Sequence, residues 1–422
     1  MSAKKFQVLL LVAIAFLGGY FFGITKVHLE WTNYKPNITV VNQEPPTTAS
    51  LVDFSLFWDV WDKLTTNYYD KKAIDPQKLL YGAISGMVAS VGDPYTMFLP
   101  PTQNSSFQQQ MAGQFSGIGA ELGMKGKQII VIAPLSGSPA MKAGLKAGDA
   151  ILAVNGITTA NEDLGKVVTL IRGPQGTKVT LTIQHKGEAK GTDITITRNT
   201  ITVKSVDGWV KQIKDIDTLG SAIKNSSKKS DYVMYIDLSQ FGDNTNGDWT
   251  NLVNSLYPQV QSKQVKGMVL DLRNNPGGLL TDAQFISGEF LPEGTTVVIE
   301  QATDGSEQKL TVDRQGKLLQ IPLVVLINGG SASASEIVSG ALRDNQRAKL
   351  VGEKSFGKGT VQSAIDLGNG AGLHVTIAKW LTPDGIWVHG KGLTPDVSAT
   401  LDTKDPSRDA QLEKAIETLY NY

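Results

Sequence analysis

The sequence predicts a multidomain α/β (α+β) protein, and three observations lead to that fold class. The chain has 422 residues, too many for one ordinary core, so two or three domains are expected. Apolar residues recur at helical spacing between residues 54 and 90, whereas short strands and glycine turns begin near Gly113. After about residue 204, strand-like and helix-like segments alternate, which indicates an α/β core around a central sheet.

The composition excludes several classes of function. Forty basic and forty acidic side chains cancel, so the chain carries no electrostatic footprint for nucleic acid. The chain has no cysteine, which excludes disulfides, thiolate metal sites and a cysteine nucleophile. Its four histidines form no ligand cluster with a recognisable spacing. We therefore expect no metal and no other cofactor.

The first residues predict a membrane anchor. Lys4 and Lys5 precede an apolar run at residues 6–24 that is broken only by Gln7 and glycines. As a helix, that run would span about 28 Å, close to the hydrocarbon core of a bilayer. The main alternative is a cleaved signal peptide, whose apolar region is usually shorter and ends at a small-x-small site. The lysines predict that residues 1–5 stay in the cytoplasm and that the rest is periplasmic or extracellular, at the cell membrane.

A linker and two helices are expected next. Residues 25–50 have turn-forming and extended chemistry without a core pattern, which is typical of a linker. Apolar, mostly aromatic side chains then recur in steps of three and four from Phe54 to Tyr68, along one face of a helix. A second helix begins at Pro76, which suits a first turn. We interpret the aromatic face as packing in a core or an interface, and it would allow a homodimer.

The region from about residue 113 to residue 203 is rich in short strands. An apolar strand at residues 129–133 is followed by Ser138-Pro-Ala-Met-Lys-Ala-Gly-Leu-Lys-Ala-Gly-Asp-Ala-Ile-Leu-Ala-Val-Asn-Gly156. This segment combines a short helix, a tight turn, a strand and an Asn-Gly turn. It resembles the PDZ domain of bacterial proteases.

The PDZ resemblance implies how protein or peptide substrates would bind. A substrate's C-terminal strand would add to the sheet edge, with its carboxylate held by backbone N–H groups of a glycine loop. Here that loop is Gly117-Ile118-Gly119-Ala120. The alternative is that the glycines only make a tight turn. Arg172, at the end of the following helix, either adds charge near the groove or faces solvent, and we favour solvent.

The segment from residue 204 to residue 400 carries the candidate chemistry. Residues 232–238 and 267–272 are predicted to be strands, and residues 249–257 a helix that Pro258 stops. The continuous apolar run at residues 321–327 is typical of a strand buried on both faces. Because active sites of α/β sheets lie at strand ends, the residues after these strands are the catalytic candidates.

Ser333 is the candidate nucleophile. It lies just past the buried strand, in the run Gly330-Ser-Ala-Ser-Ala-Ser-Glu336, which is too small to pack a core and opens a helix. At a helix start, unpaired N–H groups and the helix dipole would stabilise a developing oxyanion. The alternative is that Ser331, Ser333 or Ser335 is only a helix N-cap.

Lys358 is the candidate general base. A lysine beside a serine is one of the few ways to activate a hydroxyl without histidine. Flanked by Gly357 and Gly359 against a core, the amine would be desolvated, which lowers its pKa and lets it accept the Ser333 proton. Gln362, four residues on, would hydrogen-bond the amine without adding charge.

Two other chemistries fit the residues less well. Residues 352–358 match the start of a phosphate-binding loop, but Gly359 stands where that loop needs serine or threonine, and no long apolar helix follows. Among the histidines, only His374 and His389 lie where they would reach Ser333 in a Ser-His hydrolase. The G-x-S-x-G elbow of many such hydrolases is missing from the sequence.

Six motifs agree in order and spacing with one protein family. They are Gly92-Asp-Pro-Tyr95, the PDZ pattern, Leu270-Asp-Leu-Arg-Asn-Asn-Pro-Gly-Gly278, the Ser-Ala-Ser-Ala-Ser-Glu run, Gly352-Glu-Lys-Ser-Phe-Gly-Lys-Gly359 and Gly390-Lys-Gly-Leu-Thr-Pro-Asp396. From about residue 51 to residue 400, the chain therefore resembles the carboxy-terminal processing peptidases, also called tail-specific proteases.

The resemblance implies a role for each matched position: a nucleophile, a general base, a glutamine that orients the base, and backbone donors of an oxyanion hole. In that order, these are Ser333, Lys358, Gln362, and the N–H groups of Ala334 and of the turn that contains Gly277 and Gly278. Glycine is needed in that turn so that the backbone can approach the substrate closely.

Two segments depart from the family pattern. Residues 207–230 are longer and more polar than expected of that connector. Residues 387–389, Trp-Val-His, bring bulk before the Gly-Lys-Gly turn. We expect neither segment to touch the catalytic positions.

The sequence thus predicts a membrane-anchored, extracytoplasmic serine endopeptidase whose PDZ domain selects apolar C-termini. The alternative is a catalytically inactive PDZ adaptor on a protease scaffold. The expected organisation is a cytoplasmic end at 1–5, a transmembrane anchor at 6–24, a linker at 25–50, a helical segment at 51–112, a PDZ domain at 113–203, a catalytic domain at 204–400 and a helical tail at 401–422.

Overall fold

The computed structural model describes Phe16 and residues 27–32, 35–40 and 52–421, with short gaps at 126, 136, 163, 186–187, 189, 203, 403–404 and 406. The chain divides into two compact units, residues 1–80 and 81–422. The predicted transmembrane anchor lies outside the described residues, apart from Phe16. Within the described part, no helix is long and apolar enough to cross a membrane.

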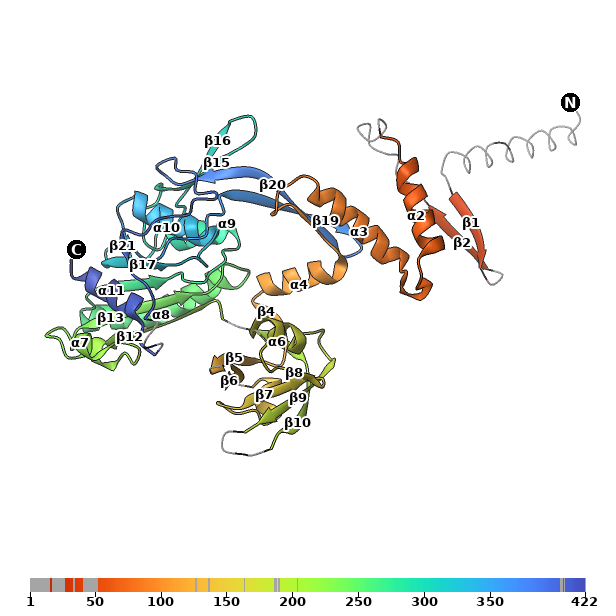
Figure 1. Ribbon diagram of the computed structural model, residues 1–422. Coiled ribbons are helices and arrows are strands. Elements are labelled where there is room, and N and C mark those ends of the chain that lie inside the picture. The colour runs from red at the N-terminus through yellow and green to blue at the C-terminus, as the bar shows by residue number, and fades with distance from the viewer. Residues whose placement is uncertain are drawn as a thin grey trace, which may run out of the picture. The chain divides into compact units, whose positions relative to one another are not determined.

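The N-terminal unit contains a β-hairpin and an α-helix (Figure 1), and the side chain of Trp58 in that helix is exposed. Strands β1 (Val27–Thr32) and β2 (Lys35–Val40) pair antiparallel. Both strands lie within the predicted linker, and the apolar–polar alternation of the sequence VHLEWT has the period of a strand. Helix α2 (Ser55–Asn67) forms where the periodicity predicted it, and none of its residues is buried. A 3₁₀ turn, η2 (Lys71–Ala73), leads on to α3.

A β-rich domain follows, as predicted. Its antiparallel sheet has the order β10-β9-β7-β6-β5, with β8 paired to β7. Its elements are β5 (Ala120–Lys125), β6 (Gln128–Pro134), α5 (Pro139–Lys142), β7 (Ala150–Val154), β8 (Ile157–Thr158), α6 (Leu164–Ile171), β9 (Lys178–Gln184) and β10 (Thr192–Thr197). Alternate residues of β9 are fully buried and pack with Val167 of α6, so the strand period of two sets the core.

A two-stranded ribbon carries the chain into and out of the β-rich domain. Strand β4 (Gln114–Gly117) enters and β11 (Asn199–Thr202) leaves, and the two strands pair antiparallel. The domain is thereby inserted between α4 (Pro101–Met111) and the α/β core.

The α/β core is built on a six-stranded sheet with the order β12-β13-β14-β17-β18-β21. Its strands are β12 (Val206–Gln212), β13 (Tyr232–Leu238), β14 (Met268–Asp271), β17 (Leu323–Ile327), β18 (Lys349–Gly352) and β21 (Val397–Ser398). Only the β12–β13 pair is antiparallel, and the other pairs are parallel. Strands β13, β14 and β17 form within the segments that the apolar runs predicted, and β17 is buried along its whole length.

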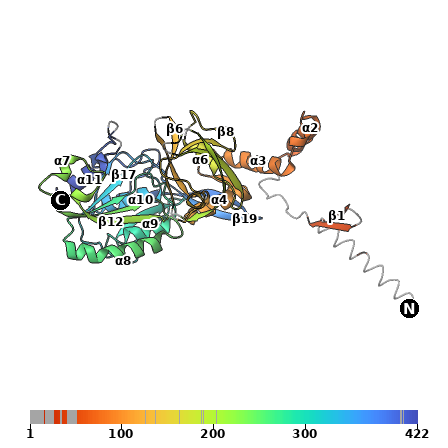
Figure 2. The ribbon, with the colours of Figure 1, turned by 90° about the horizontal axis from the view of Figure 1, so that it is seen from below.

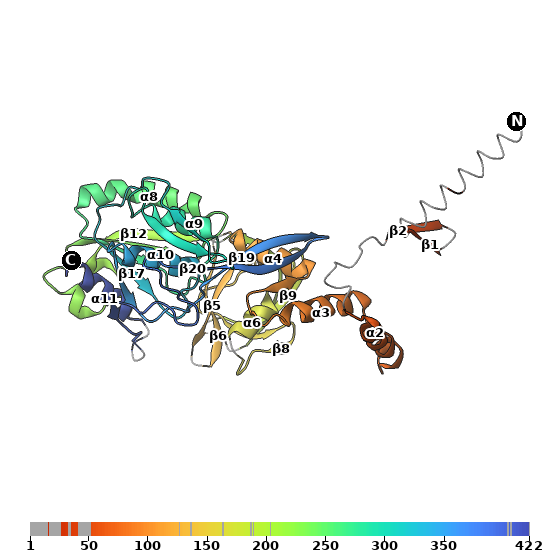
Figure 3. The same ribbon diagram turned by 90° about the horizontal axis from the view of Figure 1, so that it is seen from above.

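Helices cover both faces of this sheet, as Figures 2 and 3 show. Helices α8 (Thr245–Lys263), α9 (Leu280–Ser287) and α10 (Ala334–Asp344) pack with one set of strand residues. On the opposite face, the alternate strand residues pack with the C-terminal helix α11 (Ala410–Leu419) and with Ile213 and Leu219 near η3 (Ile213–Asp215) and α7 (Ser221–Lys224). The polar connector at 207–230 therefore contributes part of the core.

Helix α8 ends later than the sequence predicted. The sequence predicted that Pro258 would stop the helix, but the helix continues to Lys263. Trp249 and Val253 are buried before the proline, and Val260 packs against the same core after it. A proline inside a helix costs about 3 kcal/mol, and the apolar burial on both sides of Pro258 offsets that cost.

A second sheet, with the order β16-β15-β20-β19, joins the core to the segment before the β-rich domain. It comprises β15 (Thr296–Gln301), β16 (Glu307–Thr311), β19 (Thr360–Gly368) and β20 (Ala371–Leu381), and β3 (Met97–Leu99) pairs with β20. The end of α3 (Pro76–Ala89) packs on this region, where Val88 of α3 clusters with Phe98 of β3 and Ala371 of β20.

Candidate active site

Three loops that follow neighbouring parallel strands meet in one cavity of about 390 Å³. Strand β14 leads into the turn at 274–279, β17 into the start of α10, and β18 into the loop that carries Lys358. Because the strands are parallel, their carboxyl ends share one edge of the sheet. The cavity is lined by Ser333, Ala334, Gly277, Gly278, Lys358 and Gln362, among others. All the predicted catalytic and oxyanion residues therefore share one site.

Ser333 sits on a strained turn between β17 and α10. Its φ is +53° and its ψ is −115°. Residues other than glycine rarely adopt this backbone conformation, which costs about 1–3 kcal/mol. Ser333 is also the N-cap of α10, so the capping role predicted as the alternative is present alongside its place in the cavity. The hydroxyls of Ser331 and Ser335 donate instead to the carbonyls of Leu272 and Asn275, at 2.8 Å each. Of the three serines in the run, only Ser333 lines the cavity.

The glycine turn is pressed against the serine. A Cβ on Gly277 would lie 2.8 Å from Ser333 Cβ, and a Cβ on Gly278 would lie 1.6 Å from the carbonyl oxygen of Phe241. Both glycines have positive φ. The Gly277 N–H already donates to Asn275 Oδ1 at 2.9 Å. Among the described residues, the N–H groups of Gly278 and Ala334 have no hydrogen-bond partner, so they are the donors available to an oxyanion.

Glu336 joins the serine turn to the lysine loop, and the sequence prediction gave it no role. Its fully buried carboxylate accepts from the N–H groups of Ser333, Lys358 and Gly357 and from the Ser355 hydroxyl, at 2.6–2.9 Å. The available sequence signal was the capping-box spacing from Ser333 to Glu336. Nothing in the sequence indicated that the second oxygen would bind a loop some 20 residues away.

Two tryptophans hold the backbone of the lysine loop. Trp380 Nε1 donates to the Lys358 carbonyl at 3.0 Å, and Trp387 Nε1 donates to the Gly359 carbonyl at 2.8 Å. The expectation that residues 387–389 do not touch the catalytic positions stays a prediction, although Trp387 bonds the residue that follows Lys358. A flanking glycine makes the contact possible, because a Cβ on Gly359 would lie 2.8 Å from Trp387 Nε1.

The Lys358 amine is desolvated but not yet bonded to the serine. Burial lowers the pKa of Lys358, while the carboxylates of Asp93 and Glu336 act in the opposite direction. Its Nζ lies 5.1 Å from the centroid of the Tyr95 ring. No hydrogen bond among the described residues joins this amine to Ser333 or to Gln362. Gln362 Nε2 donates to the hydroxyls of Thr360 and Thr376, at 2.9 and 3.1 Å, so the expected orienting contact is not made in this structure.

The two alternative chemistries find no support in the geometry. His374 lines the cavity, and burial together with the Lys358 charge lowers its pKa, but its ring packs edge-on against Phe107. His389 stacks on Trp387. Neither histidine is hydrogen-bonded to Ser333 in the described part of the chain. The segment 352–358 runs into strand β19 rather than a helix, so it lacks the helix N-terminus of a phosphate loop.

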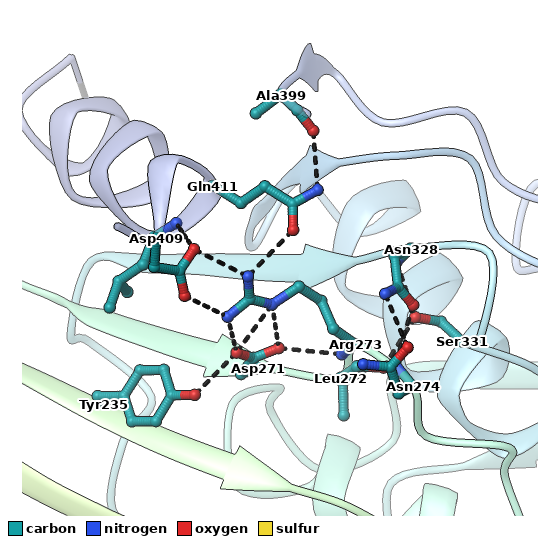
Figure 4. A network of polar contacts seen from close by, with 11 residues as sticks. Tyr235, Asp271, Leu272, Arg273, Asn274, Asn328, Ser331, Ala399, Asp409 and Gln411 are labelled. Atoms are coloured by element: carbon teal, nitrogen blue, oxygen red, sulfur yellow. Dashed lines mark hydrogen bonds and ion pairs between the residues drawn. The ribbon is translucent and has the colours of Figure 1, made fainter. Parts of the chain in front are cut away.

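An ionic network around Arg273 precedes the glycine turn, as Figure 4 shows. Arg273 bonds both oxygens of Asp271 and both oxygens of Asp409, which caps α11, and Gln411 accepts from it as well. The next residue, Asn274, exchanges two hydrogen bonds with Asn328 at the end of β17. The C-terminal helix and two strand ends therefore hold the glycine turn in place.

The predicted glycine loop of the β-rich domain lines a groove of about 400 Å³. Gly117, Ile118, Gly119 and Ala120 form part of its lining, and apolar side chains of β4, β5, α6 and β11 contribute to the rest. In the described residues, the N–H groups of Ile118 and Gly119 are unpaired, as a carboxylate site needs. Arg172 is exposed, as favoured, yet it also lines the groove with its guanidinium 5.0 Å from the Phe115 ring.

Comparison with known families gives three matches along the chain. Residues 232–399 match the description "Peptidase family S41", and residues 130–185 match "PDZ domain". Residues 14–101 match "Activating protease CtpB N-terminal domain".

Individual relatives extend the likeness over most of the chain. The carboxy-terminal processing protease CtpA of Bacillus subtilis is 35% identical over 86% of this chain and 72% of its own length. A "Probable CtpA-like serine protease" of Staphylococcus aureus is 40% identical over 82% of this chain and 64% of its own length. Among solved structures, the photosystem II D1 C-terminal processing protease is 30% identical, with a TM-score of 0.50, over 83% of this chain and 95% of that one.

Proposed function

The chain belongs to peptidase family S41, as a serine-type peptidase of the carboxy-terminal processing group, and we propose that it cleaves peptide bonds with a Ser333–Lys358 dyad. The observation that carries the proposal is the shared cavity. In it, a strained serine at a helix N-terminus adjoins two unpaired N–H groups and a desolvated lysine. A serine hydroxyl and a neutral amine are sufficient for acyl transfer without histidine.

In the proposed reaction, neutral Lys358 takes the proton of Ser333 Oγ as that oxygen bonds to the substrate carbonyl carbon. The carbonyl oxygen becomes an oxyanion and accepts from the N–H groups of Ala334 and Gly278. The Lys358 ammonium then protonates the leaving amine as the C–N bond breaks, and an acyl-enzyme remains. Water, deprotonated by the same amine, hydrolyses the ester and restores Ser333.

We propose that the PDZ domain selects substrates that end in apolar residues. Leu122, Val168 and Ile171 line its groove and would bury an apolar last side chain. The unpaired N–H groups of Ile118 and Gly119 would hold the terminal carboxylate. Amidation of the substrate tail removes this carboxylate, so it should raise KM with little change in kcat.

We propose that the peptidase works outside the cytoplasm, anchored at the cell membrane by residues 6–24, as a homodimer formed through α2. The lysines before the apolar run support the location and the anchor. The exposed Trp58 and Val60 of α2 support the homodimer. Digestion of the C-terminal domain in intact cells by added protease tests the location. Sedimentation of the parent chain and of Trp58→Glu tests the dimer, and a monomeric parent would refute it.

The dyad is tested with the full 422-residue chain and an unfolded protein that ends in an apolar tail. We expect Ser333→Ala to lower kcat by about 10⁴-fold or more. Lys358→Arg should be similarly inactive, because a guanidinium cannot be deprotonated in a protein. Equal turnover by Ser333→Ala would refute the dyad.

The same assay separates the remaining alternatives. A catalytically inactive adaptor would bind the tail without cleaving it, even in the parent chain. A Ser-His hydrolase would lose cleavage in His374→Ala or His389→Ala, and the dyad predicts that at least part of the activity survives in both.

A further inference from the structure

One sequence motif has no role in the reaction as described above: the turn at residues 92–96, between α3 and β3. Gly92 ends the helix with φ +81°. Asp93 accepts from the Tyr95 N–H at 3.1 Å and from the Thr96 hydroxyl at 2.7 Å. The Thr96 hydroxyl accepts in turn from the Thr376 N–H of β20 at 3.1 Å. The turn is therefore closed by its own side chains and fastened to the sheet that carries Gln362.

The tip of this turn reaches the catalytic lysine. The Tyr95 ring centroid lies 5.1 Å from Lys358 Nζ, and both residues line the same cavity. His389 packs edge-on against Tyr95 at 6.0 Å and stacks on Trp387 at 5.2 Å. Trp387 also donates to the Gly359 carbonyl, so the loop that carries the lysine contributes to the packing behind the ring.

We propose that Tyr95 is a positioning residue for Lys358, whose ring seats the amine beside Ser333 and stabilises the ammonium that forms when Lys358 takes the serine proton. This inference rests on the proposed function, because it assumes that Lys358 is the base. It gives the segment before the PDZ domain a direct part in the active site.

The chemistry of the ring suits this task. An aromatic face attracts a cation within about 6 Å, most strongly where water is excluded. The ring carries no full charge. It therefore offsets part of the cost of desolvating the Lys358 ammonium without holding the amine in a permanent ion pair. The other groups that face Lys358 are the Asp93 and Glu336 carboxylates, which favour the ammonium, and His374 on β20, which the lysine charge disfavours as a cation.

The test compares Tyr95→Leu with Tyr95→Phe in the full chain, by the pH dependence of kcat/KM. Tyr95→Phe keeps the ring and should behave like the parent. Tyr95→Leu removes the stabilisation of the ammonium, so the acid limb should move to lower pH by about half a unit to one unit. Its plateau kcat should fall about tenfold, with little change in KM, because the base is weaker and less well placed.

Tyr81→Leu is the matched control. Tyr81 lies on α3 and packs on Phe98, 5.8 Å between ring centroids, without lining the cavity. It should leave the pH profile of the parent unchanged. If Tyr95→Leu loses activity without moving the acid limb, or keeps the parent's profile, the proposal is overturned.

A second measurement does not depend on turnover. In a Ser333→Ala background, the rate at which acetic anhydride acylates Lys358, followed by mass spectrometry across pH, reports the pKa of the amine. The midpoint should fall by the same half to one unit in Tyr95→Leu and not in Tyr95→Phe. An unchanged midpoint refutes the role of Tyr95, whereas active Ser333→Ala or Lys358→Arg enzymes would instead refute the dyad.

Discussion

The two halves of the active site differ in how they are held. In the serine half, Ser333 donates its N–H to the buried Glu336 carboxylate. The neighbours of Gly278 and Ala334 are fixed as well, because Gly277 donates to Asn275 Oδ1 and Ser335 donates to the Asn275 carbonyl. In the lysine half, the backbone of Lys358 is held equally well, but its amine rests against an aromatic ring and Gln362 bonds two threonines. The proposed oxyanion donors are thus in place, whereas the proposed proton-transfer contact is not.

This difference indicates which half of the site must move during the reaction. Backbone N–H groups in a dry cavity stabilise a developing charge without reorganisation, so the serine half gains from rigidity. A lysine side chain turns about several bonds, and Lys358 lines the same cavity as Ser333, so we expect a change of rotamer to bring its amine to the serine. Mutations in the serine half should therefore lower activity by displacing the backbone. Mutations in the lysine half should lower it by changing the charge and the pKa of the amine.

Glu336→Ala should have the largest effect, because it breaks both halves at once. Removing the carboxylate leaves four buried donors without a partner, which should lower the free energy of unfolding by about 3–5 kcal/mol. Activity should fall below detection. Urea unfolding and kcat measure the two effects. Glu336→Gln keeps one carbonyl acceptor and should be intermediate in both, and parent-like values for Glu336→Ala would contradict the linking role.

Gly278→Ala should come next and damage the serine half alone. The added methyl would collide with the Phe241 carbonyl, so the turn must shift and the Gly278 N–H must leave the oxyanion position. We expect kcat to fall by about 10²–10³-fold. Gly247→Ala is the control, since a Cβ at Gly247, in α8, meets nothing within 4 Å. A fully active Gly278→Ala would exclude this N–H as an oxyanion donor.

Gln362→Ala should have a smaller effect on the lysine half. Gln362 bonds the hydroxyls of Thr360 and Thr376 rather than the amine, so its loss should lower kcat by less than about tenfold. A drop as large as that of Lys358→Arg would mean that Gln362 binds the lysine during turnover. Steady-state kinetics at saturating substrate separate the two outcomes.

Lys358→Met should have the smallest effect on stability, opposite in sign to that of Glu336→Ala. Burial lowers the folded-state pKa of Lys358, so the unfolded chain binds more protons between the folded and unfolded pKa values. The lysine therefore costs stability below the folded pKa, and that cost shrinks as the pH rises through it. Lys358→Met should raise the free energy of unfolding at neutral pH and lose this advantage toward pH 10.5. Thermal unfolding of the inactive variant across pH measures the change, and a destabilised variant would contradict it.

Some features follow from local sequence because neighbouring residues decide them. The apolar runs located β13, β14 and β17, and residues that follow β14 and β17 line the cavity. The residue types of Ser333, Lys358, Gly277 and Gly278 already indicated a nucleophile, a base and close backbone approach. Local periodicity failed where distant packing outweighed it, as at Pro258 in α8.

The sequence by itself determined which chemical groups the site contains and which strands they follow. The tertiary structure decided which of them meet: that Gly278 rather than Gly277 keeps a free N–H, that Glu336 spans to the lysine loop, and that Tyr95 lies against Lys358. The last two of these contacts join residues tens to hundreds of positions apart. Side-chain packing sets such distances, and a local pattern does not say which distant segment a residue will pack against.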